Sequence, residues 1–312
     1  MAESSPALLA AAASVVCAWP SLQAAAVEVL LTPCPFDKAR RTEAAALQWR
    51  SGTLPIVSAD GTDAITPDAP ARPAELVSKG KMKSGSMKAM LHGVCHAESY
   101  AIDLMWDSVA RFALDDGEGG PAPPREFFDE WVNIASDEAR HFCGWARHME
   151  GKYQTRYGDL PSHDMLWEVA SATRHSLRAR LAIVHLIHEA RGLDSAPAMR
   201  ERCIRAQDVI AAEMLDRNIA DEVRHVGAGV KWFRRLCDVS ADAGGDASDL
   251  AAFEFQRLAK LYYHGALKRP FNEELRRMAG LPEDWYWPLA EKVEGQAEYR
   301  PATGLVEARQ KA

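Results

Sequence analysis

The chain has 312 residues, of which 47% are hydrophobic and 26% charged, so it is long enough to bury a substantial core in one large domain or two small ones. Its formal net charge of −7 argues against a protein that binds nucleic acids or anionic membranes through general charge attraction. The six cysteines are scattered without a Cys-x-x-Cys pair, which favours neither a zinc ribbon nor a disulfide framework and is typical of a reducing compartment.

The N-terminal stretch from Ser4 to Val27 carries no charged residue. Pro6 and Pro20 interrupt it, and Ser and Gln residues dilute its apolar character, so we do not expect it to span a membrane. A signal or transit peptide begins with basic residues, whereas Glu3 is the only charged residue before this stretch. We therefore expect a cytoplasmic protein.

Apolar residues recur at helical spacing along most of the chain, and no segment alternates as a strand does, so we predict an all-α fold. The predicted helices cover 21–31, 36–49, 86–113, 124–157, 164–191, 197–237, 249–265 and 272–279. Their ends are placed at capping residues, glycines and prolines. Ser21 is the predicted N-cap of the first helix, Gly192 ends the fifth, and the sixth could be broken near Cys203.

The composition divides the chain into three parts. Residues 1–80 hold two packing helices and an extended surface connection from Ser51 that is rich in Gly, Pro, Asp and Ala. Residues 81–240 hold the four longest helices, which we expect to form a four-helix bundle, and a Gly-rich segment over 239–248 closes the last of them. Residues 241–312 hold shorter helices that we expect to pack on this bundle.

The pentapeptide Asp-Glu-x-Arg-His occurs twice, each time inside a long predicted helix. The Glu and His of the two copies are Glu138 with His141 and Glu222 with His225. Residues three apart share one helix face, so each pair can point at a common metal ion. A single Glu-x-x-His pair is a weak signal, because such a pair more often lies on a solvated surface. Two copies of the extended motif, both on apolar stripes, favour a metal site.

Each of these helices follows another helix with an inward-facing glutamate. Helical periodicity places Glu98 and Glu189 on apolar stripes of their own. Burying four ionised carboxylates together is costly unless protons or cations neutralise them. Two divalent ions would balance four glutamates, and neutral His141 and His225 would complete the coordination. We therefore predict a dinuclear site with six ligands, whose mixed carboxylate and imidazole character suits iron or manganese better than zinc.

The aspartates of the two pentapeptides are candidates for holding the histidines. A metal-bound histidine usually donates its other ring N–H to a carboxylate, which fixes the tautomer. Across the repeat, we expect Asp221 to reach His141 and Asp137 to reach His225. The alternative for each aspartate is an ion pair with a nearby arginine on the helix surface.

Two further polar residues lie one helical turn before predicted ligands. His185 precedes Glu189, and Asn218 precedes Glu222, so both should border the metal cavity. Either residue could bind a substrate or occupy an extra coordination position. The alternative for both is a buried, hydrogen-bonded polar side chain without a role in the chemistry.

Further motifs accompany the pentapeptides in a specific order. They are His96-Ala97-Glu98, Ala101-Ile102-Asp103-Leu104, Asp129-Glu130-Trp131-Val132, the segment from Glu189 to Asp194, Gly229, Trp232-Phe233 and Arg269-Pro270-Phe271-Asn272. Over about Leu22 to Leu289, the chain resembles the ferritin-like proteins grouped under a domain of unknown function numbered 455. The resemblance implies a ferritin-like four-helix bundle with extra N-terminal and C-terminal helices, which binds two metals through the same six residues. It does not choose among oxygenases, oxidases and iron stores.

These observations lead to the hypothesis of an O₂-using oxidase or oxygenase that holds two divalent metal ions, with iron favoured and manganese as the alternative. Its partners would be a small organic substrate and an electron donor, both unknown. A non-catalytic, iron-handling or stress-protective metal-binding protein is the alternative, and a metal-free helical interaction protein is a third hypothesis. We expect no nucleic-acid partner and no membrane association, and a homodimer is one open oligomeric state.

Overall fold

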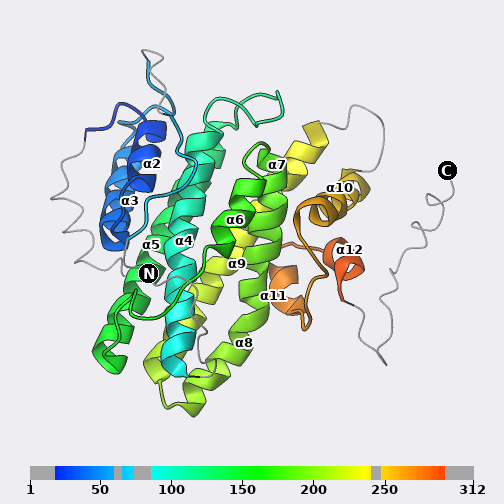
Figure 1. Cartoon of the computed structure of the whole chain (residues 1–312). Coiled ribbons are helices and arrows are strands. Elements are labelled where there is room, and N and C mark those ends of the chain that lie inside the picture. Colours follow the sequence, from blue (N-terminus) through cyan, green and yellow to red (C-terminus); the bar gives the residue numbers. More distant parts are fainter. Residues whose placement is uncertain (1–17, 60–64, 74–85, 240–246, 292–312) are drawn as a thin grey trace.

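The computed structural model describes residues 18–59, 65–73, 86–239 and 247–291, and Figure 1 shows how its helices are arranged. The elements are α2 (Leu22–Leu30), α3 (Pro35–Arg50), α4 (Met87–Arg111), α5 (Arg125–Tyr153), α6 (Met165–Ala172), α7 (Leu177–Arg180), the π-helix η1 (Leu181–Glu189), α8 (Ala190–Arg205), α9 (Val209–Val239), α10 (Ala247–Tyr262), α11 (Glu273–Met278), α12 (Glu283–Tyr286) and the short 3-10 helix η2 (Trp287–Leu289). These described ranges contain no β-strand, which confirms the predicted all-α class.

Four long helical segments occupy the centre of the molecule. α4 packs along α5, and α9 packs against α5, η1 and α8, while α7, η1 and α8 follow one another without interruption. η1 approaches α9 so closely that a Cβ atom at Gly229 would lie 2.8 Å from His185 Cβ. In Figure 1, α2 and α3 lie on one side of this centre, against α4 and α5, and α10, α11 and α12 lie on the other.

Side-chain caps set the starts of several helices where the sequence predicts them. Ser21 Oγ accepts a hydrogen bond from Ala24 N, Ser86 Oγ from Ala89 N, and Asn272 Oδ1 from Leu275 N, each at 3.1 Å. Each cap satisfies a backbone N–H that has no partner inside its helix. The predicted boundaries of α2, α4 and α11 are confirmed to within one helical turn.

The helix predicted over 164–191 is wrong in its continuity and in its end. α6 stops at Ala172, and the segment that begins with α7 does not end at Gly192 but continues to Arg205. A glycine inside a helix costs only about 1 kcal/mol relative to alanine, which packing overrides. Gly192 therefore does not mark the end of the helix. α8 also continues through Pro197.

Pro197 is tolerated because another segment replaces the hydrogen bond that it removes. Proline has no backbone N–H, so the carbonyl of Leu193, four residues earlier, loses its helical partner. The side-chain amide of Asn272 donates to this carbonyl at 3.4 Å. Asn272 is 79 positions away in the sequence, so nothing local predicts that the helix survives.

The helix predicted from residue 197 begins instead at Val209. Gln207 adopts a left-handed φ of 54°, which interrupts the helix, and the Asp208 side chain accepts a hydrogen bond from Ala211 N at 3.2 Å. The interruption thus lies just after Cys203, near which a break was considered. The Gly-rich segment over 239–248 and the uncharged N-terminal stretch lie largely outside the described residues.

Buried ion pairs tie the neighbouring helices to α4. Lys38 on α3 pairs with Asp103, and Arg180 on α7 donates to Asp107 at 2.5 Å. All four side chains are fully buried. Removing one partner of such a pair would leave an uncompensated charge in the core, so these contacts hold the helices at a defined position.

The extended connection predicted over 51–80 is described at 51–59 and 65–73. Its second part lies against α2 and α4, since Ala71 N donates to the Leu30 carbonyl at 2.8 Å and Arg72 donates to the Ser99 hydroxyl at 2.9 Å. This part confirms the expected surface course. The division of the chain into three parts stays a prediction.

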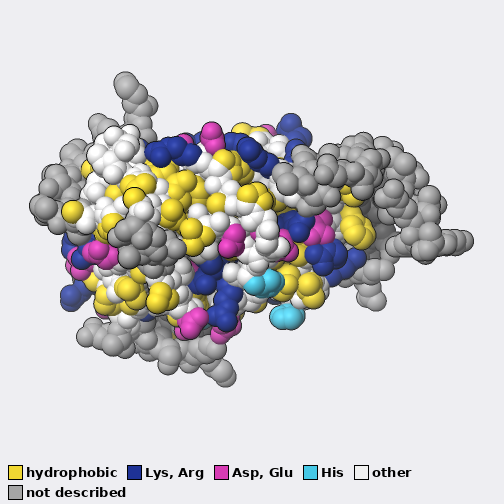
Figure 2. All heavy atoms as spheres, turned by 90° about the horizontal axis from the view of Figure 1, so that it is seen from above, with side chains coloured by type: hydrophobic (Ala, Val, Ile, Leu, Met, Phe, Trp, Pro, Cys, Tyr) yellow, Lys and Arg dark blue, Asp and Glu magenta, His cyan; other side chains and the backbone are white. Residues whose placement is uncertain are grey.

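The surface shows mixed chemistry. Figure 2 presents one end of the molecule, on which acidic, basic and apolar side chains are interspersed. Among the described residues, no helix combines the length and apolar character needed to cross a bilayer. The described ranges contain Cys34, Cys95, Cys143, Cys203 and Cys237, and none of these forms a disulfide bond.

Asp208 offers a test of how the junction between α8 and α9 is held. Its carboxylate accepts hydrogen bonds from Tyr153 at 2.7 Å and from His148 at 2.8 Å, and it caps α9. We expect Asp208→Ala to lower the free energy of unfolding by about 1–3 kcal/mol, because the cap is lost and buried donors lose their acceptor. Urea denaturation near neutral pH measures this loss.

The pH dependence of stability checks the same contact. Burial opposes ionisation of Asp208, but hydrogen bonds from His148, Tyr153 and Lys152 lower its pKa from 3.8 to about 2. Its contribution is therefore present above about pH 4 and is lost as the pH falls toward 2, a loss that Asp208→Asn should lack. As a control, Asp216→Ala on the exposed face of α9 should cost less than about 1 kcal/mol. Equal effects of the two alanine variants would contradict the role of Asp208.

Candidate metal centre

Three long helices bring most of the predicted ligands together. Glu98 lies on α4, Glu138 and His141 on α5, and Glu222 and His225 on α9. Four of these residues form a tight group, in which one ligand atom from each lies within 4.8 Å of the others: Glu98, Glu138, His141 and Glu222. Glu138, His141 and His225 are only 1–2% exposed. This buried group of carboxylates and imidazole could bind a metal ion.

The carboxylates of Glu138 and Glu222 lie between the two imidazoles. One oxygen of Glu138 is 3.5 Å from His141 Nδ1, and the other is 2.9 Å from His225 Nδ1. The two oxygens of Glu222 are 3.7 Å and 3.6 Å from the same two nitrogens. Glu98 Oε2 lies 3.7 Å from His141 Nδ1. Glu138 and Glu222 each direct one oxygen toward each histidine, as a carboxylate shared by two ions would.

The outer nitrogens of both histidines face aspartates of the opposite pentapeptide. His141 Nε2 lies 3.0 Å from Asp221 Oδ2, and His225 Nε2 lies 3.3 Å from Asp137 Oδ2. The structure thus contains both hydrogen bonds expected across the repeat. When Nε2–H donates to a carboxylate, the Nδ1 lone pair of each ring is left for the buried group.

Arg140 and Arg224 surround the same two aspartates. Arg140 contacts Asp137 and lies 3.2 Å from Asp221, whereas Arg224 contacts Asp221 and lies 3.4 Å from Asp137. The ion pairs considered as an alternative therefore exist together with the hydrogen bonds to histidine. Burial opposes ionisation of the aspartates, but the bonds from the histidines and the charge of Arg140 lower the pKa of both. The lowered pKa values favour the ionised form of both aspartates at neutral pH.

Several buried polar atoms of this site have no hydrogen-bond partner within the described residues. They are Nδ1 of His141, Nδ1 of His225, Oε2 of Glu138 and Oε1 of Glu189. Leaving such an atom unpaired costs about 1–3 kcal/mol, so native proteins contain few of them. All four are metal-ligating atom types, and coordination to a metal ion would satisfy them. The residues therefore fit a metal centre.

The electrostatics of the group point in the same direction. Burial and the neighbouring Glu138 charge raise the pKa of Glu98 to about 7, against the lowering effect of His141. Burial also raises the pKa of Glu222. Burial alone would lower the pKa of His141 and of His225, but the surrounding carboxylates raise both well above 6.5. The group attracts positive charge, which protons or divalent ions can supply.

Glu189 lies outside the tight group. It is the last residue of η1, and it lies 3.0 Å from His185 Nδ1. Because a π-helix has wider turns than an α-helix, the 3.6-residue period used for the sequence does not hold along this segment. His185 packs against Trp131, with ring centroids 4.9 Å apart, and reaches the site through Glu189. The role of Glu189 as the sixth ligand stays a prediction.

Asn218 borders the site, as the sequence predicts. Its amide oxygen accepts a hydrogen bond from Trp145 Nε1 at 3.0 Å, and its amide nitrogen donates to the Met214 carbonyl at 3.0 Å. The side chain also lies 3.5 Å from Glu98 Oε1. Its polar atoms are thus satisfied by neighbours, among them Trp145.

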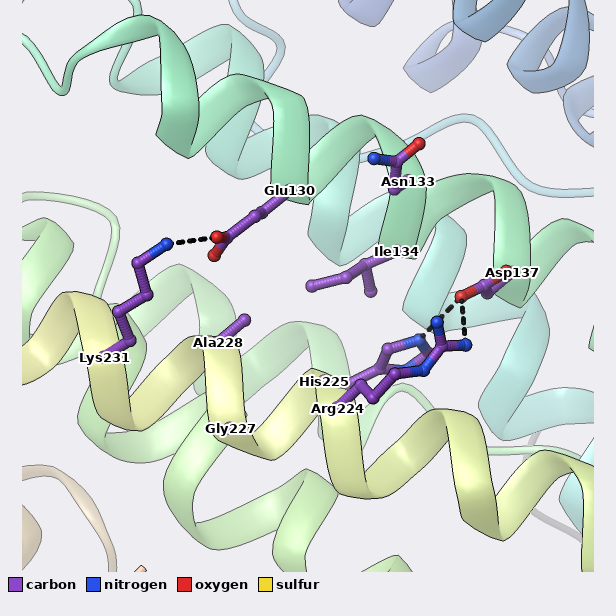
Figure 3. A pocket seen from close by; sticks show the side chains of 9 residues that line it. All are labelled: Glu130, Asn133, Ile134, Asp137, Arg224, His225, Gly227, Ala228 and Lys231. Atoms are coloured by element: carbon purple, nitrogen blue, oxygen red, sulfur yellow. Dashed lines mark hydrogen bonds and ion pairs between the residues drawn. The ribbon is translucent and has the colours of Figure 1, made fainter. Parts of the chain in front are cut away.

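A polar groove of about 320 Å³ lies on one side of the group, between α5 and α9. Figure 3 shows Glu130 paired with Lys231 at one end of the groove and Asp137 contacting His225 and Arg224 at the other. The groove is lined by the Asp137 and His225 side chains. The charged outer part of the site is therefore reached from this surface.

A second cavity, of about 380 Å³, adjoins the carboxylates themselves. It is lined by Glu98, Glu138, Glu189 and Glu222, so it brings the predicted fourth glutamate to the same space as the other three. Part of its wall is formed by small residues that were not among the predicted site residues, namely Gly93, Ala97, Ala101, Gly192 and Ala196. Their spacing of four residues along one helix face is the sequence pattern that indicates such a wall.

Comparisons with known proteins place this site in a larger group of sequences. Residues 31–287 match a family described as protein of unknown function (DUF455). An uncharacterized protein of Haemophilus influenzae is 33% identical over 213 residues, which cover 66% of this chain and 69% of that protein. No solved structure matches the chain. The matched family range contains every predicted ligand.

We expect Glu98→Gln to separate stability from metal binding. In the metal-free protein, the variant should raise the free energy of unfolding by about 1 kcal/mol, because it removes one of several buried carboxylates that repel one another. With metal at 100 times its Kd, the wild type should gain about 2.7 kcal/mol and the variant clearly less. Urea denaturation with and without Mn²⁺ measures both. Glu150→Gln, at an exposed position of α5, is the control and should change neither quantity. A full metal response in Glu98→Gln would contradict a ligand role.

The hydrogen bond from His141 to Asp221 gives a second expectation. Asp221→Asn should weaken metal binding by about 10–100-fold, since the imidazole loses the anion that orients it. A chelator competition assay measures the affinity. Asp216→Asn lies on the same helix at an exposed position and should leave the affinity unchanged. Equal affinities for the two variants would show that Asp221 does not support the site.

Proposed function

Since the chain belongs to the family described as protein of unknown function (DUF455), we propose a function from the site. The protein binds two divalent metal ions and uses O₂ to oxidise or hydroxylate a small organic substrate. The observation that carries the proposal is the placement of Glu138 and Glu222. Each directs one oxygen toward His141 and the other toward His225. A carboxylate between two imidazoles in this way suits two metal ions better than one.

We propose that the central helices form a ferritin-like four-helix bundle. Its members would be α4, α5, the continuous segment of α7, η1 and α8, and finally α9. In chain order these segments carry a lone glutamate, a Glu-x-x-His pair, a lone glutamate and a second Glu-x-x-His pair. This alternation is the ligand pattern of the dinuclear carboxylate bundles. The helices α2, α3, α10, α11 and α12 would be additions to that bundle.

The charges of the site support two divalent ions. Glu98 and His141 would serve one ion, Glu189 and His225 the other, and the two central glutamates would serve both. Four glutamates then balance four positive charges, while neutral imidazoles add none. Oxygen and nitrogen ligands without thiolate favour iron or manganese over a structural zinc site.

When bound, two such ions would supply the reaction with O₂ and the oxidising power for the substrate. The tasks of the protein are orientation and the exclusion of water. Asp137 and Asp221 hold the imidazoles in one tautomer. Ile102, Phe142 and Val226, adjacent to the ligands in sequence or one turn away, are completely buried, and we expect them to keep water from the group.

The cavity beside the carboxylates favours an enzyme over a non-catalytic metal store. A store has no need of a space for an organic molecule, whereas an oxidase or oxygenase must place its substrate next to the metals. An electron donor would be required as well, and a reducing cytoplasm would provide one.

Metal analysis tests this proposal. Protein expressed in medium supplemented with iron and manganese should contain about two metal ions per chain, and the reduced protein should consume O₂. Glu222→Ala should lose metal because it removes a shared ligand, whereas Asp216→Ala should retain it. Absence of both iron and manganese from the wild type would overturn the proposal. Uptake of many more than two irons per chain would favour a store instead.

A further inference from the structure

We propose that the cavity of about 380 Å³ next to the carboxylates is a binding site for an uncharged, mainly apolar small molecule that enters between α4 and α8. The volume lies within the roughly 300–1,000 Å³ typical of small-molecule sites. That this molecule is the substrate rests on the proposed function, whereas its binding does not.

Small side chains create the space. Gly93, Ala97 and Ala101 follow one another at intervals of four on α4, and Gly192 and Ala196 do so on α8. A Cβ atom added at Gly93 or at Gly192 would meet no atom within 4 Å. Gly93, Ala97 and Gly192 are also exposed, so the cavity opens to solvent along these two helices.

The remaining wall is apolar. Apart from the glutamates and the small residues, it consists largely of Met90, Val94, Leu104, Leu166, Val184, Met199, Leu215 and Ile219. Larger side chains of this kind lose water contact when a ligand covers them, which is the main contribution to binding an apolar molecule. The wall therefore favours ligands with a large apolar surface.

The polar groups of the wall are mostly committed to other contacts. Ser195 Oγ donates to the Gly192 carbonyl at 3.1 Å, and the Asn218 amide is bonded to Trp145 and Met214. Among the non-acidic polar residues of the wall, His188 stands apart, because its Nε2 has no hydrogen-bond partner among the described residues. Away from the four glutamates, a ligand thus finds few free donors or acceptors in the wall, which disfavours a strongly polar molecule.

Charge excludes anions. The inner wall consists of Glu98, Glu138, Glu189 and Glu222, which would repel an anion in the metal-free protein. With two divalent ions bound, the glutamates are neutralised and offer no net attraction to a charged ligand. The polar groove in Figure 3 provides the contrast, since its Glu130, Lys231 and Arg224 suit polar ligands and water.

Binding of 1-aminoanthracene, an uncharged fluorophore whose emission rises in apolar surroundings, tests the inference on the full-length protein. The wild type should bind it saturably at one site per chain. Gly93→Leu and Gly192→Leu should each weaken binding by about tenfold or more, which corresponds to about 1.4 kcal/mol, because leucine fills the space. Both changes replace glycine inside a helix by a better helix former, so they should not unfold the protein.

Gly151→Leu is the matched control. Gly151 is exposed on α5, and a Cβ atom there would also meet nothing within 4 Å, so this variant should bind the fluorophore as the wild type does. Unchanged binding in both cavity variants would overturn the inference. Equally tight competition by the anion 1-anilinonaphthalene-8-sulfonate would overturn the assignment to uncharged ligands.

Metal content measured on the same samples separates the two proposals. If the protein holds about two metals but the fluorophore does not bind in the cavity, the cavity inference fails and the metal proposal stands. If the fluorophore binds and is displaced by the leucine substitutions while iron and manganese are absent, the metal proposal fails and the cavity stands.

Discussion

Three glutamates and two histidines meet inside the helical core, with Glu189 lining the cavity beside them, and the cost of burying these groups shapes much of what surrounds them. The aspartates of the two pentapeptides hold the imidazoles, and Arg140 and Arg224 hold the aspartates. Two aspartates and two arginines sum to zero charge. This outer layer therefore orients the histidines without neutralising the glutamates, and the negative charge at the centre is left for protons or metal ions.

Precise placement of the ligands depends on how α4 is fixed. Asp103 and Asp107 follow Glu98 by five and nine positions, which puts them on the far side of the helix from the carboxylate group. Lys38 and Arg180 pair with these aspartates in full burial. The outer helix α3 and the central helix α7 thus hold the side of α4 that is opposite its ligand, so a segment outside the centre also helps to define the site.

Much of this arrangement follows from local sequence, and the exceptions have physical causes. The helices that carry the pentapeptides are regular, so a 3.6-residue period was enough to bring Glu138 and Glu222 inward. The same period does not describe η1, because a π-helix turns by a different angle per residue, so the role of Glu189 stays a prediction. The helix continues past Gly192 because a glycine costs little, and past Pro197 because Asn272 donates to the carbonyl that the proline leaves without a partner. A contact across 79 positions leaves no local signal.

The site has two unlike sides, and an oxidation of an apolar molecule would need both. Charged groups line the groove toward Asp137 and His225, where water and protons can approach the imidazole side of the centre. Apolar and small residues line the cavity toward Glu98 and Glu189, where an organic molecule would displace water from apolar surface. Such a reaction needs a supply of protons and electrons, while bulk water must be kept out of the space in which the metal centre would contact its substrate. A helix that was uniformly polar or uniformly apolar could not provide this separation. The amphipathic helix α9 does so, because it contributes Arg224 to the polar groove and Leu215 to the apolar cavity.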